Sequence, residues 1–114
     1  MANPDIGSLA TLRYDIDIKA LTTTTSTIVA EVATGEVHVI ESIAIAGIAN
    51  GSFTMNLNHG TTAFIASAQV TGFQTTLLGN DAKNVLTVKE GSYVTGNASA
   101  NSSVNVFVNK RVMT

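Results

Sequence analysis

The sequence predicts an all-β fold: an antiparallel β-sandwich, jelly-roll-like, of about eight or nine short strands. Apolar residues recur at every second position over most of the 114 residues, which is the period of a strand with one buried face. Turn-forming residues separate these runs about every ten residues, a spacing typical of sandwiches. Aromatic residues make up only 5% of the chain, so small aliphatic side chains must fill a thin core.

Two segments differ in pattern. Residues 1–11 lack a sustained apolar alternation and contain Pro4, the only proline of the chain, so we expect an extended N-terminal arm. Residues 12–114 carry the alternation and form a single β-sandwich domain, because a chain of 11.8 kDa has enough surface to bury one apolar core.

The first predicted strand is residues 12–20. Five apolar side chains alternate there with four charged ones, and we interpret the apolar row as the buried face and the charged row as a solvated stripe. The apolar row is Leu12, Tyr14, Ile16, Ile18 and Ala20, and the charged row is Arg13, Asp15, Asp17 and Lys19.

The next predicted strands follow a threonine tract at residues 22–25. In residues 28–32 the apolar Ile28, Ala30 and Val32 alternate with Val29 and Glu31, and a turn at residues 34–36 contains Gly35. Residues 37–45 are rich in β-branched side chains and partly apolar on both faces, as expected of a central strand. A change of face within this run predicts a β-bulge near Ile40 and Glu41.

The dipeptide Asn50-Gly51 lies between two extended runs and predicts a two-residue hairpin. Residues 53–57 form the strand after it, which closes at residues 58–60. Residues 61–70 are predicted as a further strand, with a short helical turn as the alternative because alanine is frequent there. The last predicted strands are residues 73–78, 85–88, 92–98 and 104–108, separated by turns at residues 79–81, 90–91 and 96–97.

The inventory of reactive side chains is poor, and we predict no enzyme, no cofactor and no metal site. The chain has no cysteine. Its two histidines are interpreted as a half-exposed strand residue, His38, and a turn residue, His59, with a two-histidine metal site as the weaker alternative. Asp15 and Asp17 are interpreted as surface charges neutralised by their basic neighbours, rather than as a cation site or an acid–base pair.

Net charge and the lengths of the apolar stretches argue against two classes of partner, nucleic acids and membranes. A net charge of -2 argues against direct nucleic-acid binding, which needs clustered lysine and arginine. No apolar stretch is long enough to span a bilayer, so no membrane contact is expected. Residues 1–60 carry a net charge of -4 and the remainder +2, which would allow head-to-tail association if the split survives in space, although scattered solvating charges are the simpler interpretation.

Two stretches resemble small β-sandwich structural proteins of tailed-bacteriophage virions. Residues 34–45 (TGEVHVIESIAI), with Asn50 and the alternating residues 53–57, are similar to the opening hairpin of that group. Residues 86–94 and 98–108 are similar to its closing strands. The resemblance implies a capsid decoration or cement protein, or a tail-associated one, commonly trimeric and without catalytic residues.

These observations predict a non-enzymatic virion protein, made in the cytoplasm of the host bacterium, that binds and stabilises the assembled shell. Its expected partners are itself, as a homo-oligomer and by the resemblance a trimer, and the major capsid protein or another virion protein. The expected contact residues are Leu9, Leu12, Tyr14, Ile16 and Ile18, in a segment able to add a strand to a neighbour's sheet.

The alternatives are a tail, baseplate or fibre component and, in a different class, a carbohydrate-binding module. The second alternative is disfavoured because sugar platforms need exposed aromatic rings and the chain has no tryptophan and only two tyrosines, Tyr14 and Tyr93.

Overall fold

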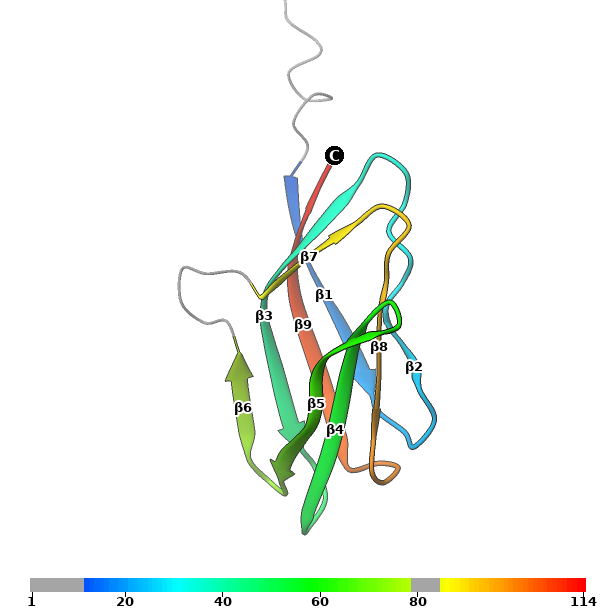
Figure 1. Cartoon of the computed structure of the whole chain (residues 1–114). Helices are drawn as coiled ribbons and strands as arrows, with labels where there is room; N and C mark the ends of the chain where they lie inside the picture. The colour runs from blue at the N-terminus through cyan, green and yellow to red at the C-terminus, as the bar shows by residue number, and fades with distance from the viewer. Residues whose placement is uncertain (1–11, 79–84) are drawn as a thin grey trace, which may run out of the picture.

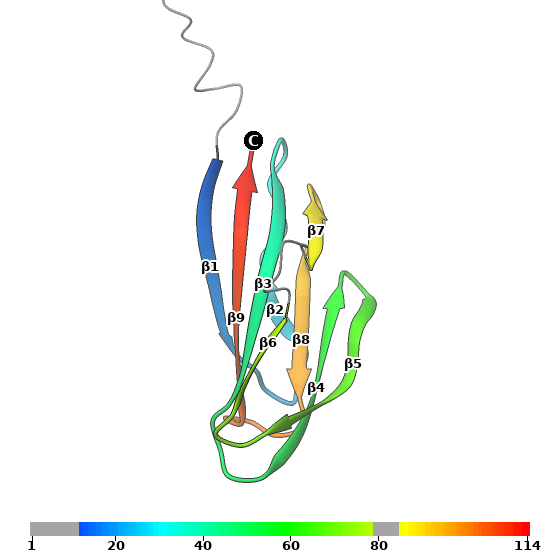
Figure 2. The same ribbon diagram turned by 90° about the vertical axis from the view of Figure 1, so that its left-hand side faces the viewer.

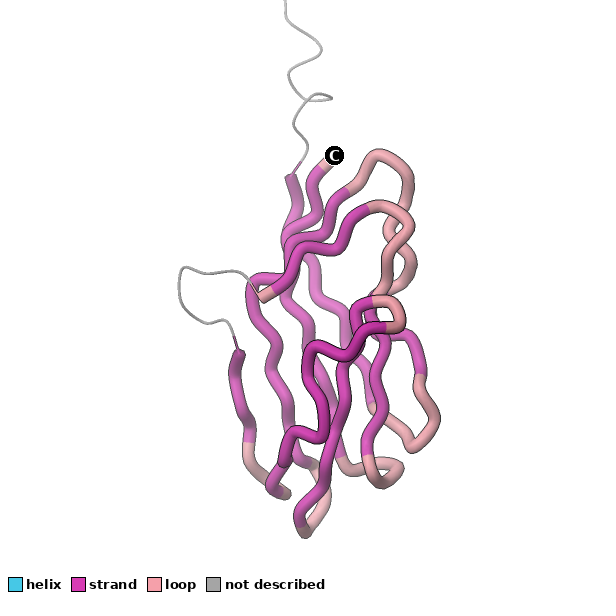
Figure 3. The backbone as a smooth tube through the Cα atoms, viewed as in Figure 1, coloured by secondary structure: helices cyan, strands magenta, loops and turns pink. Residues whose placement is uncertain are grey.

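A computed structural model describes residues 12–78 and 85–114. This part of the chain contains nine strands and no helix (Figure 3). The strands form two antiparallel sheets that pack on one another (Figure 1), which confirms the predicted all-β sandwich. The predicted arm at residues 1–11 and the predicted turn at residues 79–81 lie outside the described residues.

Each sheet is built from strands that are distant in sequence. Sheet A has the order β1 (Leu12–Ala20), β9 (Val104–Met113), β3 (Val37–Gly47) and β6 (Thr75–Leu78), and β7 (Leu86–Lys89) pairs with the other half of β3. Sheet B has the order β2 (Ser26–Val29), β8 (Val94–Ala98), β4 (Ser52–His59) and β5 (Thr62–Thr71). Figure 2 shows β1 at one edge of sheet A, beside β9.

The connectivity is that of a jelly roll. Strand β4 pairs with β5, β3 with β6, β2 with β8 and β1 with β9, all antiparallel. The chain is therefore one long antiparallel ribbon that reverses at the β4–β5 turn and is rolled into two sheets. Gly60 occupies that turn with a φ of 63°, a conformation that glycine adopts without steric cost.

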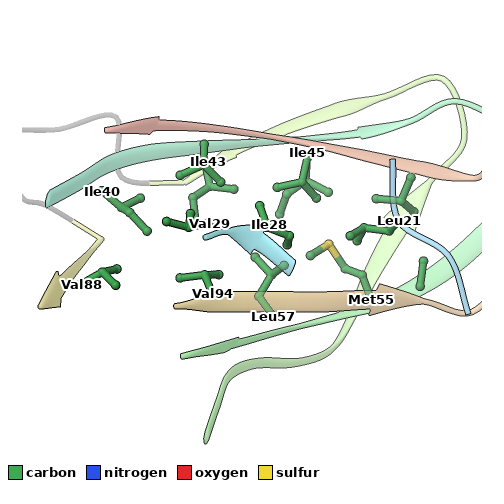
Figure 4. Close-up of a cluster of buried hydrophobic side chains, with 14 of the residues drawn as sticks. Leu21, Ile28, Val29, Ile40, Ile43, Ile45, Met55, Leu57, Val88 and Val94 are labelled. Atoms are coloured by element: carbon green, nitrogen blue, oxygen red, sulfur yellow. The ribbon is translucent and has the colours of Figure 1, made fainter. Parts of the chain in front are cut away.

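The core lies between the sheets and consists of aliphatic side chains (Figure 4). Sheet A supplies Ile43 and Ile45 from β3, and sheet B supplies Met55 and Leu57 from β4. Strand β9 adds a row of buried valines at every second position, Val104, Val106 and Val108. The alternation seen in the sequence is therefore the alternation between this core and the outer faces.

Several local predictions are confirmed. Strand β3 is central, because it pairs with β9 on one side and with β6 and β7 on the other. Its register against β9 shifts between Ile40 and Ser42, which is the predicted bulge. The turns at Gly35 and Gly91 are present, with φ values of 85° and 79°. Residues 62–71 form strand β5, so the alternative of a helical turn there is wrong.

The predicted two-residue hairpin at Asn50-Gly51 is wrong. The flanking strands β3 and β4 belong to different sheets, and residues 48–51 carry the chain from one sheet to the other. The backbone of Gly47 instead bonds to the β5–β6 turn, with its N–H donating to Gln74 O and its carbonyl accepting from Phe73 N–H. Long-range pairing therefore overrides the local turn signal.

The predicted turn at residues 96–97 is also wrong, because Gly96 and Asn97 lie inside strand β8. A Cβ atom on Gly96 would lie 2.8 Å from Asn56 O and 2.9 Å from Ile28 Cδ1. The glycine therefore permits close packing at the centre of the sandwich and does not mark a turn.

Candidate functional site

Strand β1 faces the opposite way from the prediction. Its charged residues lie opposite the core-facing row of β9: Asp17 is paired with Val108 and Lys19 with Val106, both fully buried valines. Directly opposed residues of an antiparallel pair share a face, so the charged row of β1 points to the core side. The apolar row points outward.

The expected contact residues within β1 are therefore exposed. Leu12 is 52% exposed, Tyr14 70%, Ile16 46% and Ile18 61%. Our interpretation of this row as a buried face is wrong. The remaining expected contact residue, Leu9, lies outside the described residues.

Asp17 also departs from the prediction of a solvated, locally neutralised pair. Its Oδ2 lies 2.5 Å from Nζ of Lys110, whose side chain is only 6% exposed. This contact is an ion pair without hydrogen-bond alignment, since the same Oδ2 has no hydrogen-bond partner. Asp15 instead accepts a hydrogen bond of 2.9 Å from the backbone N–H of Ile16. The two carboxylates therefore have separate structural partners.

The exposed row of β1 continues across the outer face of sheet A. One apolar row runs from Ile18 through Phe107 and Ala44 to Leu77. A second row joins Leu12, Met113 and Val37. We use "outer face of sheet A" for the outward residues of β1, β9, β3 and β6, which are Leu12, Tyr14, Ile16, Ile18, Ala20, Asn105, Phe107, Asn109, Arg111, Met113, Val37, Val39, Ser42, Ala44, Ala46, Thr75 and Leu77. Of these, Val39 is buried.

Two polar contacts lie on this face. Asn109 Nδ2 donates to Ser42 Oγ at 3.1 Å, between the two apolar rows. Arg111 Nη1 lies 3.8 Å from Glu41 Oε2 at the bulge of β3. Arg111 Nε and Asn105 Oδ1 are buried without a hydrogen-bond partner among the described residues, so only some of the polar groups on the face are already satisfied.

The outer face of sheet B has a different chemistry. Asn56 bonds to Asn97 at 3.1 Å and Asn58 to Thr95 at 3.3 Å, both between β4 and β8. Thr54 N–H donates to Ser99 Oγ at 3.0 Å in the adjacent row. These outward side chains are polar and uncharged, and they bond along the sheet. Of the two outer faces, that of sheet A is the apolar one.

The histidines do not form a site. His38 is 7% exposed, so the prediction of a half-exposed residue is wrong, and its Nε2 lies 3.1 Å from Glu36 Oε1. His59 ends β4 in sheet B, whereas His38 lies in sheet A, so they are not on adjacent strands. Within residues 12–78 and 85–114, no three His, Cys, Asp or Glu side chains gather in an arrangement that could hold a metal ion.

The charge split along the chain does not survive folding. Strand β1 pairs with β9, and the ion pairs Asp17–Lys110 and Glu41–Arg111 each join an acid of the first half to a base of the second. The pattern therefore gives no support to head-to-tail association by opposite charges.

A small apolar cavity of about 190 Å³ opens between the sheets where β5 and β6 diverge. Its lining includes Ile45 and Leu78 from sheet A and Met55 and Val70 from sheet B. Its walls are mostly apolar, with Gln69 and Thr76 as the polar residues among them, so the cavity can hold a small hydrocarbon group but offers few polar atoms that would orient a substrate.

Comparison with known proteins links the chain to no family: no family model matches it, and no curated protein matches it in sequence. The part of the chain that the structure describes has no helix with the length and apolarity needed to cross a membrane.

Sequence reasoning identified the β1 residues of the apolar face but missed Phe107, Met113 and Leu77. Phe107 and Met113 share a parity along β9 that is opposite to the buried valines, and this was the available signal. Leu77 depends on the pairing of β6 with β3, which residue spacing alone does not predict.

Proposed function

We propose that the protein is a non-enzymatic structural protein of a tailed-phage virion, a capsid decoration or cement protein that stabilises the assembled shell. The observation that carries this proposal is the outer face of sheet A. Exposed apolar side chains lie on β1, on β6 and at the end of β9, with the partly buried Phe107 and Ala44 between β1 and β6, and exposed apolar patches often mark surfaces that a protein partner covers.

The fold is compatible with this role, because jelly rolls build many viral capsid proteins. Fold alone does not determine function, so the apolar face carries the argument. A protein that binds the assembled lattice and not its free subunits stabilises the lattice by mass action. Contacts repeated by an oligomer would add avidity to each weak contact.

A tail, baseplate or fibre component would use the same kind of surface and differs only in its place in the particle. A carbohydrate-binding module is favoured by one specific observation: Tyr14 is 70% exposed on the face of a jelly roll, and lectins share this architecture. A glycan array with the purified protein and a Tyr14→Ala variant tests it, and binding that the variant loses would favour the module over the virion protein.

Co-sedimentation tests the virion proposal. The purified chain is mixed with phage particles that lack it, the particles are pelleted, and the bound protein is quantified. We expect saturable binding and a higher melting temperature of the decorated particle. Immunogold labelling then separates a shell location from a tail location. Protein that stays in the supernatant at all concentrations would contradict the proposal.

The contact element is tested in the same assay by deleting residues 1–11. We expect weaker binding to particles and an unchanged circular dichroism spectrum, because the sandwich begins at β1. Full binding by the truncated chain would remove the arm from the contact and leave β1 as its only predicted element.

A further inference from the structure

The outer face of sheet A is large enough to hold a partner. Strands β1, β9 and β3 have nine, ten and eleven residues. With a rise of about 3.3 Å per residue and strands about 4.8 Å apart, their common face measures on the order of 500 Å². The largest apolar patches on monomeric proteins are of this size and are often functional.

We propose that a second copy of this chain covers this face, with the two sheets packed face to face about a two-fold axis that runs across the strands. The inference rests on the proposed function, in which the protein is an oligomeric subunit, and it names the partner of that surface. In this arrangement the face that carries the proposed function is the contact between subunits, and the open edge of β1 stays free for contacts with the lattice.

The rows of the face are complementary to themselves under this rotation. The apolar row of Leu12 and Met113 lies near one end of the face, and the apolar row of Ile18 and Phe107 lies three rows along. A two-fold axis midway between them places each row on the other row of the partner. The intervening rows, which contain Arg111 and Asn109, then pack on one another.

The polar groups in these intervening rows are partly paired within each copy. Asn109 is already bonded to Ser42, so its amide keeps a partner in a dry interface. Arg111 and Glu41 have opposite charges on the same face, 3.8 Å apart. Two copies therefore meet without like-charge repulsion, and each Arg111 gains access to a second Glu41.

The open edge of β1 is a poorer place for self-association. Its nine residues pair with β9 without a bulge, so the other edge is straight. However, the N–H of Ile16 on that edge already donates to the carboxylate of Asp15. An antiparallel β1–β1 pair centred on Ile16 would also set Asp15 against Asp17 and Arg13 against Lys19, which is like charge against like charge.

The area predicts a reversible dimer. Two faces together bury on the order of 1,000 Å², at the lower end of specific interfaces. The dissociation constant is then expected to be about micromolar, and the weight-average mass should rise with concentration from the 11.8 kDa of one chain towards twice that value.

Sedimentation equilibrium of the full chain at about 1–500 µM tests the proposal, in a range that brackets the expected dissociation constant. The variant Ile18→Lys places a charge in the apolar row and should raise the dissociation constant at least tenfold. Its matched control is Thr54→Lys, which places the same charge at an exposed site on the outer face of sheet B and should leave dimerisation unchanged. Ile18 is 61% exposed, so circular dichroism should show both variants folded.

Cross-linking tests the orientation, since the chain has no cysteine of its own. Leu12→Cys and Ile18→Cys are prepared separately and treated with a short bismaleimide. The proposed axis predicts efficient cross-linking only when the two variants are mixed. Cross-linking of each variant with itself at equal yield would overturn the axis.

Other outcomes overturn the proposal as a whole. These are a monomer at all concentrations, a trimer, and a dimer that Ile18→Lys and Thr54→Lys affect equally. Failure here is distinguishable from failure of the virion role, because a chain that is monomeric in solution can still pellet with particles, and a dimer can fail to do so.

Discussion

The buried ion pair between Asp17 and Lys110 makes an asymmetric prediction about stability. The Lys110 side chain is 6% exposed and that of Asp17 is 27% exposed. In Asp17→Asn the ammonium group stays buried without its counter-charge, and we expect a loss of about 2–3 kcal/mol, below the full cost for a completely buried pair because Asp17 is partly solvated.

The converse substitution should cost less. In Lys110→Met the methionine keeps the apolar stem against the core, and Asp17 can turn towards water, so the expected loss is about 1 kcal/mol. The double variant should be close to Lys110→Met alone, which corresponds to a coupling energy of about 2–3 kcal/mol, the loss expected for Asp17→Asn.

Urea unfolding followed by circular dichroism measures these differences. With a slope of about 1–3 kcal/mol/M, Asp17→Asn should lower the midpoint by about 1 M or more. The measurement belongs at low protein concentration, where self-association adds nothing to stability. If Asp17→Asn lowers the stability no more than Lys110→Met does, then Asp17 does not point inward to compensate a buried Lys110 ammonium group.

Four further substitutions can be measured by the same unfolding experiment. Gly96→Ala should lower the free energy of unfolding by about 2–3 kcal/mol, because its Cβ would meet backbone and side-chain atoms at 2.8–2.9 Å. Gly35→Ala, at a φ of 85° in open space, should lower it by only about 1 kcal/mol. Equal losses would contradict the packing role of Gly96. Leu57→Ala should lose about 3 kcal/mol, and a loss below about 1 kcal/mol would place Leu57 outside the core. Phe73→Gly, at a φ of 61° and 73% exposed, should be neutral or stabilising by up to about 1 kcal/mol, and a clear loss would mean that the ring packs on something.

The fold class could be predicted because it depends on the spacing of apolar residues and on the positions of turn-forming residues, and both are local features of the sequence. Strands β4 and β9 bury one row each, so alternation marks them, and glycines with positive φ mark the turns at Gly35 and Gly91. The errors at Asn50-Gly51 and at Gly96 have the opposite cause. At both positions the backbone contacts segments that are distant in sequence, and such contacts cannot be inferred from the neighbouring residues alone.

The candidate site was half predictable for a related reason. Alternation in residues 12–20 separates an apolar row from a charged row, but the period is the same whichever row faces inward. For a strand in the middle of a sandwich, burial decides in favour of the apolar row. Strand β1 lies at the edge of sheet A, where burial is a weaker criterion, so its pairing with β9 determines which row faces inward.

Strand β9 contains the signal that decides. Its buried row is valine at residues 104, 106, 108 and 112, but the same row has Lys110, which is 5% exposed. A lysine on a core-facing row requires an anion from a neighbouring strand, because an unpaired buried ammonium is too costly. In β1 the carboxylates share a row with Arg13 and Lys19, so meeting that requirement turns the whole charged row inward. The apolar row then has to face outward, and the exposed face follows from the need to pair one buried charge.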